Sequence, residues 1–277
     1  MLAMPDEVET GYADLNGTRL YYETAGSGRP VVLVHGFGLD RRMWDAQFFD
    51  FARQWQVVRY DLRGFGRSAL PVVGEPYRHV DDLAALMDHL SIEQAALVGL
   101  SLGGLVVLNT ALEFPGRVSA LVLVDAIVGG RPMSAAWNDD YRAVRNQARE
   151  HSVEASKQAW LNLSLFAPAR AHPQAGPRLR QMTADWSGWQ FDNRDPENTV
   201  VPAIDRLGEV RVPALVLVGE RDQPDFLAIA NELKAGLPEA RQGVVPGAGH
   251  MLPMEAPGEF NALVMDFLKS SVSISGK

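Results

Sequence analysis

The sequence has no cysteine, which excludes disulfides, thiolate metal sites and a cysteine nucleophile. A chain without cysteine also suits a reducing compartment, so we expect a cytoplasmic protein. No run of about 18 apolar residues occurs, and a membrane-spanning helix is therefore not expected. Residues 1–10 carry three acidic side chains and no apolar stretch, so we predict neither a signal peptide nor a membrane anchor there.

Positive charge is scarce: 34 Asp and Glu residues outnumber 26 Lys and Arg residues, which gives a formal net charge of -8. Nucleic acids and anionic membrane surfaces are bound through concentrated Lys and Arg, so we expect neither as a partner. No ligand cluster for a metal or an organic cofactor is visible, and we expect neither. The sequence does not indicate an oligomeric state.

Short, continuous apolar runs alternate with amphipathic segments along most of the chain. Residues 8–15 and 18–24 are expected to form a hairpin around Asn16-Gly17, a pair that suits a tight turn. Continuous apolar runs are typical of parallel strands covered by helices on both faces, so the alternation predicts a doubly wound α/β sheet. The further strand candidates are 31–34, 57–60, 95–98, 121–124, 214–218 and 242–245, with helices expected at 80–90 and 102–114.

The alternation stops between residues 128 and 202, where no apolar strand run occurs. Helices are expected at 134–151 and 153–166. We interpret 128–202 as a helical cap inserted into a core made of residues 1–127 and 203–277. The alternative is a set of helices packed beside the sheet, with their tryptophans buried for stability alone. Four of the six tryptophans lie in this segment: Trp137, Trp160, Trp186 and Trp189.

A serine stands between a strand candidate and a helix candidate, in Gly99-Leu100-Ser101-Leu102-Gly103. In such a tight turn the hydroxyl is pushed into the open, and glycines two residues before and after avoid side-chain collisions. The pattern alone is common, but this context predicts Ser101 as a nucleophile. The alternative is a glycine-rich turn with an idle serine.

A nucleophilic serine needs a general base. His250 follows the last strand candidate in the glycine-rich stretch Pro246-Gly247-Ala248-Gly249-His250, which frees the backbone to place an imidazole above the sheet edge. We therefore predict His250 as the base. Of the other histidines, His35 is expected to brace a loop, His79 and His89 to be solvated or to cap a helix, and His151 and His172 to lie in the cap.

The imidazole must be oriented by an acid. Asp222 is the best candidate, because it follows strand 214–218 at the carboxyl end, where parallel sheets place their sites. Two rivals remain. Asp125 ends strand 121–124 and could serve in a different layout, whereas Glu220 could equally form surface ion pairs.

A developing oxyanion needs preorganised N–H donors. The backbone N–H of Leu102 is one candidate, since it would lie at a helix N-terminus, where the dipole favours negative charge. The second candidate is the N–H of Phe37 in His35-Gly36-Phe37-Gly38. The alternative for this second stretch is a plain glycine-rich turn.

Together with Tyr60-Asp61-Leu62-Arg63-Gly64-Phe65-Gly66-Arg67-Ser68, these stretches resemble the α/β-hydrolase superfamily, in the family's order and over nearly the whole chain. The resemblance implies an eight-stranded, mostly parallel sheet, a Ser-Asp-His triad and a lid between strands six and seven. It also implies that Asp61 and Arg63 belong to the framework. Within the superfamily the chain resembles small bacterial carboxylesterases and enol-lactonases. Ser101 differs from the aspartate that epoxide hydrolases and haloalkane dehalogenases carry at that position.

The expected activity is hydrolysis of a carboxylic ester or lactone through an acyl-enzyme, with a small molecule as the partner. Three alternatives stay open: a carbon–carbon bond hydrolase, a cofactor-free perhydrolase, and a ligand-binding protein with an idle triad. An apolar pocket is expected around the serine, although the same aromatics could simply join cap to core. Its candidate lining residues are Phe37, Trp44, Trp137, Trp160, Trp186, Trp189 and Met251.

Overall fold

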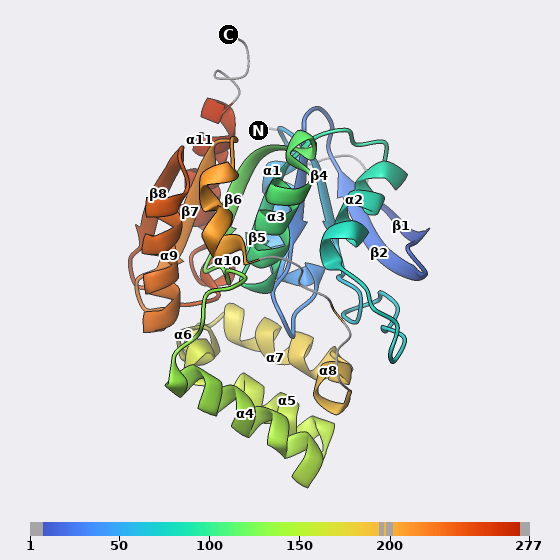
Figure 1. The fold of residues 1–277 in the computed structure, drawn as a ribbon, viewed down its shortest axis with the longest axis vertical. Coiled ribbons are helices and arrows are strands. Elements are labelled where there is room, and N and C mark those ends of the chain that lie inside the picture. Colours follow the sequence, from blue (N-terminus) through green and yellow to red (C-terminus); the bar gives the residue numbers. More distant parts are fainter. Residues whose placement is uncertain (1–7, 194–196, 198–201, 272–277) are drawn as a thin grey trace.

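The computed structural model describes residues 8–193, 197 and 202–271, and its centre is an eight-stranded sheet (Figure 1). The strand order is β1-β2-β4-β3-β5-β6-β7-β8, with β1–β2 and β2–β4 antiparallel and all other pairs parallel. This confirms the expected α/β architecture. The strands are β1 (Val8–Leu15), β2 (Thr18–Ala25), β3 (Pro30–Val34), β4 (Gln56–Tyr60), β5 (Ala95–Leu100), β6 (Val118–Val124), β7 (Ala214–Gly219) and β8 (Ala240–Val245).

Helices cover both faces of the sheet, which is why its central strands are apolar throughout. All six residues of β5 and all six of β7 are buried. Helices α1 and α11 pack on one face, and α2, α3 and α9 pack on the other (Figure 1). The helices of this core are α1 (Asp45–Phe51), α2 (His79–His89), α3 (Leu102–Glu113), α9 (Pro224–Gly236), α10 (Leu252–Glu255) and α11 (Pro257–Ser270), with 3₁₀ turns η1 (Arg41–Trp44), η2 (Pro115–Arg117) and η4 (Ala203–Glu209).

The winding of the sheet reverses between β3 and β5. The chain passes from β3 outward to β4 and then returns to β5 on the other side of β3. Val34 pairs with Gly99, so the loops that follow β3 and β5 leave the sheet side by side. Open α/β sheets bind their ligands at such a reversal, outside the carboxyl ends of the strands.

Between β6 and β7 the described residues form helices and no strand of the sheet. We call residues 135–192 the helical layer; it lies across one end of the sheet, with α7 between the sheet and α4 (Figure 1). Ser134 and Ser152 cap α4 and α5 by accepting from Trp137 N and Ala155 N. The layer comprises α4 (Ala135–Glu150), α5 (Val153–Leu161), η3 (Ser164–Phe166), α6 (Ala167–Ala171), α7 (Ala175–Asp185) and α8 (Trp189–Asp192).

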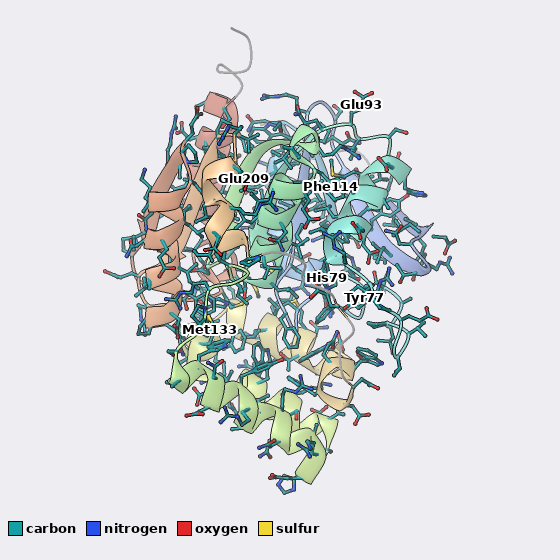
Figure 2. The ribbon with its side chains drawn as sticks, in the orientation of Figure 1. Tyr77, His79, Glu93, Phe114, Met133 and Glu209 are labelled. Carbon is teal, nitrogen blue, oxygen red and sulfur yellow. The ribbon has the colours of Figure 1, made fainter. Side chains whose placement is uncertain are left out.

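The helix expected at 134–151 is confirmed, and the one expected at 153–166 is interrupted after Leu161 and resumes as η3. Figure 2 labels Met133 in the connection that leads from β6 into α4. Parts of the expected cap (194–196 and 198–201) and of the expected core (1–7 and 272–277) lie outside the described residues. No helix in the described ranges is both long and apolar enough to cross a membrane.

Buried ion pairs tie β2, η1 and the end of β4 together. Arg41 bonds Glu23 at 2.7 Å and Asp61 at 2.9 Å, and Arg59 bonds Glu23 at 2.6 Å. Arg63 pairs with Asp82 of α2 at 2.7 Å. These contacts give Asp61 and Arg63 structural partners away from Ser101.

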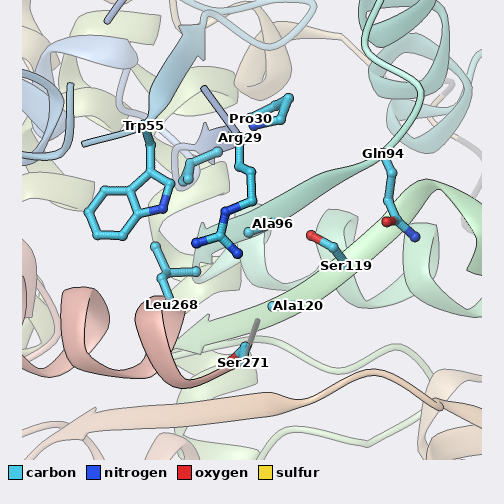
Figure 3. A pocket seen from close by; sticks show the side chains of 10 residues that line it. Arg29, Pro30, Trp55, Gln94, Ala96, Ser119, Ala120, Leu268 and Ser271 are labelled. Atoms are coloured by element: carbon cyan, nitrogen blue, oxygen red, sulfur yellow. The ribbon is translucent and has the colours of Figure 1, made fainter. Parts of the chain in front are cut away.

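A cavity of about 200 Å³ lies at the opposite end of the sheet, where β3, β5 and β6 begin (Figure 3). Trp55, Ala96 and Leu268 supply its apolar wall, and Arg29 lines its mouth. It is therefore remote from the carboxyl ends of the strands, where the candidate residues lie.

Candidate active site

Ser101 occupies a single-residue turn between β5 and α3. Its backbone has φ 55° and ψ -112°, a conformation that costs energy for any residue with a side chain. Three hydrogen bonds hold it there: Ser101 N donates to Val124 O at 3.0 Å, and Ser101 O accepts from Leu105 N and from Ile127 N, each at 3.1 Å. The orientation of this serine is thus imposed by the end of β6, the residues that follow it and the first turn of α3.

Glycine at position 103 is required by close packing. A Cβ there would collide with the carbonyl oxygens of Val34 and His35, so the start of α3 lies directly against the end of β3. Ser101 as a whole residue is 7% exposed, so most of the turn is buried. The turn is buried because further chain packs over the sheet edge.

The two expected oxyanion donors lie on neighbouring segments. Leu102 is the first residue of α3, so its N–H has no partner within the helix. Phe37 belongs to the loop after β3, which His35 braces: Nδ1 contacts Gly36 O at 2.8 Å, and Nε2 accepts from Leu62 N at 2.9 Å. Burial lowers the pKa of His35, which keeps the ring neutral and suits this pair of contacts.

His250 and Asp222 form a buried pair beyond the carboxyl ends of β8 and β7, the strands that they follow. His250 Nδ1 lies 2.9 Å from Asp222 Oδ2, and the other Asp222 oxygen accepts from Gln223 N at 2.6 Å. Because the carboxylate can only accept, Nδ1 carries the shared proton and Nε2 is left as the basic nitrogen. Glu220 instead accepts from Gly247 N at 2.9 Å and supports the loop.

Asp125 also reaches this pair, although it follows β6. One carboxylate oxygen each of Asp125 and Asp222 and one ring nitrogen of His250 lie within 4.8 Å of one another. Such a group has the composition of a metal site, but His250 Nδ1 and Asp222 Oδ2 are already hydrogen-bonded to each other. Burial, followed by the charge of Asp222, raises the pKa of Asp125 well above its usual value.

Glu255, in α10, is not among the residues expected at the site. Its two carboxylate oxygens accept from the backbone on either side of the histidine: from Gly249 N at 2.7 Å and from Met251 N at 3.0 Å. Burial raises the pKa of Glu255. An acidic residue one helical turn after a histidine loop is the only sequence signal for this contact.

Aromatic rings connect the sheet edge to the helical layer. Phe37 has four ring neighbours: Trp186 at 5.1 Å, Trp160 at 5.3 Å, Phe65 at 5.6 Å and Phe191 at 6.0 Å between centroids. We call these five residues the aromatic cluster. Edge-to-face contacts of this kind add to the energy of simple burial.

The cluster continues to the histidine. Phe166 contacts Trp160 at 5.4 Å and the His250 ring at 6.4 Å, and Phe226 approaches the His250 ring at 4.3 Å. Trp137 contacts both Trp160 and Phe226. The rings therefore form a continuous apolar wall from Phe37 to His250.

Three other residues expected to line the pocket are placed differently. Trp44 is buried in the core and packs on Phe260 of α11 at 6.0 Å. Trp189 starts α8, is half-buried and has no ring contact with another described residue. Met251 is fully buried beside His250. A substrate contact at Trp44, Trp189 or Met251 stays a prediction.

The hydroxyl of Ser101 makes no side-chain hydrogen bond with any residue the structure describes. Its approach to His250 rests on strand order: Ser101 follows β5, Asp125 follows β6 and Asp222 follows β7, on three adjacent strands. Strands in a sheet are about 4.8 Å apart, so β5 and β7 are separated by about 10 Å. An imidazole between them can bridge that gap.

The chain belongs to the α/β-hydrolase family, because residues 29–257 match the family model for the alpha/beta hydrolase fold. A curated relative, the 2-hydroxy-6-oxo-6-phenylhexa-2,4-dienoate hydrolase of Burkholderia cepacia, is 28% identical over 273 residues, which cover 92% of each chain. The expected family is thereby confirmed.

Two solved structures have the same fold and similar sequences. A thermophilic esterase from Thermogutta terrifontis has a TM-score of 0.77 and 29% identity, over 95% of this chain and 99% of that one. The enol-lactonase from Burkholderia xenovorans LB400 has a TM-score of 0.78 and 26% identity, over 94% and 100%. These similarities support hydrolase activity and confirm the resemblance to bacterial esterases and enol-lactonases.

Proposed function

We propose that this protein hydrolyses a carboxylic ester or lactone, with Ser101 as nucleophile, His250 as general base and Asp222 as the orienting acid. The observation that carries the proposal is the buried contact of 2.9 Å between His250 Nδ1 and Asp222 Oδ2, at the same end of the sheet as the strained serine turn. It leaves Nε2 as the nitrogen that can take the serine proton.

The reaction runs in two halves. Ser101 Oγ attacks the carbonyl carbon while His250 Nε2 takes the hydroxyl proton, and the N–H groups of Phe37 and Leu102 stabilise the oxyanion. His250 then gives the proton to the departing alkoxide, which leaves an acyl group on Ser101. Water attacks this acyl group with His250 again as base, and the carboxylic acid is released.

The aromatic wall supports a small to medium, apolar substrate. Phe37 supplies both an oxyanion N–H and a ring that contacts Trp160 and Trp186, so the acyl or alcohol group would lie against rings. An apolar group gains about 25 cal/mol for each Å² that it buries there. We propose that residues 128–202 act as the cap that supplies this wall and keeps bulk water from the acyl group.

The direct test is a panel of p-nitrophenyl esters and lactones assayed with wild-type protein and with Ser101→Ala. We expect the substitution to lower kcat by about 10⁶, as in other serine triads. The matched control is Ser119→Ala on β6, which lines the cavity at the other end of the sheet and should keep wild-type activity. A Ser101→Ala protein that still turns over the best substrate at a comparable rate would refute the proposal.

Carbon–carbon bond hydrolysis is the second candidate, because a relative of 28% identity is named as a dienoate hydrolase. The same panel should therefore include a vinylogous diketone, together with a peroxide assay for perhydrolase activity. A diketone with the highest kcat/KM would replace ester hydrolysis as the proposed reaction. If no substrate reacts and a fluorophosphonate does not label Ser101, the remaining alternative is a ligand-binding protein.

A further inference from the structure

The buried acid–base pair of His250 and Asp222 has a third carboxyl group against it, that of Asp125. Asp125 follows β6 and Asp222 follows β7, and these two strands are neighbours in the sheet (Figure 1). Asp125 is 1% exposed, and the Asp222 side chain is fully buried. An oxygen of Asp125 lies within 4.8 Å of an oxygen of Asp222. Two ionised carboxylates at that distance, away from water, would repel each other strongly.

The two oxygens of Asp125 have different surroundings. Oδ1 accepts a hydrogen bond from Gly219 N at 2.9 Å. Oδ2 is buried and, among the described residues, has no hydrogen-bond donor. A buried carboxylate oxygen without a donor is costly, whereas a protonated oxygen becomes a donor itself and needs only an acceptor. The Asp222 carboxylate, which has an oxygen within 4.8 Å of an Asp125 oxygen, is the candidate acceptor.

We infer that Asp125 is a positioning residue for the proposed hydrolysis: its carboxyl group stays protonated and donates a hydrogen bond from Oδ2 to the Asp222 carboxylate. Through this bond it holds Asp222 in line with His250 without adding a second negative charge. The inference rests on the proposed function for its catalytic consequence, but the protonation of Asp125 is a property of the fold.

The titratable groups that face Asp125 are Asp222, His250 and Glu255. Burial is the largest cause that raises the pKa of Asp125, and the charges of Asp222 and Glu255 raise it further. The hydrogen bond from Gly219 N acts in the opposite direction. Desolvation and two acidic neighbours together favour the neutral acid.

The backbone of Asp125 also links the two halves of the site. Its φ of 42° is uncommon for a residue with a side chain, and aspartate and asparagine tolerate it best. Val124 O and Ile127 N, on either side of it along the chain, both bond the backbone of Ser101. One kinked residue therefore contacts the nucleophile turn through its neighbours and the acid–base pair through its side chain.

The test makes the same substitution at both carboxyl groups. Asp125→Asn keeps a neutral donor at this position, so kcat/KM should stay within about threefold of wild type, whereas Asp222→Asn should lose about 10⁴-fold because it removes the charge that orients His250. Asp125→Ala removes the donor, and kcat should fall about 10- to 100-fold with KM little changed.

Two results would overturn the inference. A loss of about 10⁴-fold in Asp125→Asn would mean that the ionised form of Asp125 is required. An Asp125→Ala protein that folds and matches wild type would remove the positioning role. Should Asp125→Ala fail to fold, the Asp125→Asn protein still decides the protonation state.

Two readouts of that state do not need activity. The infrared difference between wild type and Asp125→Asn at pH 7 should show the carbonyl band of a protonated carboxylic acid; a carboxylate band alone contradicts the inference. The Tm of Asp125→Asn relative to wild type should also rise between pH 5 and pH 8, because the wild-type unfolded chain releases a proton that the native protein retains. A pH-independent difference would contradict it too.

Failure of the proposed function gives a different pattern. An active Ser101→Ala protein would remove the serine mechanism, yet the infrared band and the pH-dependent Tm would still report whether Asp125 is protonated.

Discussion

Ser101 and His250 are held in place by different kinds of contact. The serine is positioned by backbone: the last residue of β6 and Ile127, which follows that strand, bond its N–H and its C=O, and α3 packs so tightly on β3 that only glycine fits at position 103. The histidine is positioned by side chains, with Asp222 on its ring and Glu255 on the flanking N–H groups. A larger side chain in the nucleophile turn should therefore abolish most of the activity. Each polar substitution in the histidine loop should lower the activity only partly.

The largest effect on activity is expected at the Ser101 turn, which backbone contacts hold in place. Gly103→Ala places a methyl group against the carbonyl oxygens of Val34 and His35 and must displace the start of α3. A shift of about 1 Å at a reacting group can cost about 100-fold, so kcat/KM should fall at least that much. Steady-state kinetics on the folded fraction measures this. The matched control is Gly116→Ala, where a Cβ meets nothing within 4 Å. Equal activities for the two variants would contradict the packing argument.

A smaller effect on activity is expected at the His250 loop, which side chains hold in place. Glu255→Gln replaces one acceptor oxygen with an NH₂ group that faces a backbone N–H, so the loop around His250 loses one of its two supports. The kcat should fall about tenfold with KM nearly constant.

Glu259→Gln is the control for this loop, because Glu259 is an exposed acid on the neighbouring helix. If Glu255→Gln and Glu259→Gln both keep full activity, Glu255 does not position His250. An increase in KM without a change in kcat would place Glu255 in substrate binding instead.

The helical layer should influence binding more than chemistry. Trp186 contacts Phe37, Phe65 and Phe191, and its indole N–H bonds Gln190 at 3.0 Å. Trp186→Leu should raise KM several-fold for bulky acyl esters and leave kcat within about threefold, since it contacts no reacting atom. Trp55→Leu, at the cavity on the opposite end of the sheet, is the control. A selective loss of kcat in Trp186→Leu would show that the cluster shapes the catalytic step.

The smallest effect concerns a second buried histidine, which lacks the carboxylate partner of His250. His79 packs on Tyr77 (Figure 2), and no described residue bonds its Nδ1. Burial lowers the pKa of His79 to about 3, so protonation favours the unfolded chain. Stability should fall as the pH drops below about 6.5, by about 1 kcal/mol by pH 5.5.

Thermal melts between pH 5 and pH 7 test this difference between the two histidines. His79→Gln should show a shallower loss of Tm in acid, by about 2–4 °C at pH 5.5, with esterase activity unchanged. The same acid dependence in both proteins would exclude His79 as its source.

The sequence was informative wherever a residue's role follows from its own neighbours along the chain. The Asn16-Gly17 turn located β1 and β2, and the short runs located the other six strands, although β6 begins at Val118, before the run that starts at Leu121, because Ser119 interrupts the apolar pattern. The strand–serine–helix order located the turn at Ser101 for the same reason.

Contacts between segments that are far apart along the chain could not be predicted from the sequence. The proximity of Asp125 and Asp222 depends on β6 lying beside β7, with Val124 opposite Leu217. His79 was expected to be solvated or to cap a helix; that is wrong, because its ring is buried at the start of α2. Nothing in the sequence distinguishes Trp44 from Trp160, yet Trp44 packs in the core and Trp160 packs beside Phe37.

The central claim is that Ser101 is activated by the pair of His250 and Asp222, and fluorophosphonate labelling followed by peptide mass mapping tests it most directly. The account predicts one adduct per chain, on Ser101, with labelling slowed at least 100-fold in Asp222→Asn and absent in Ser101→Ala. A wild-type protein that is not labelled, or a label that maps elsewhere, would contradict it.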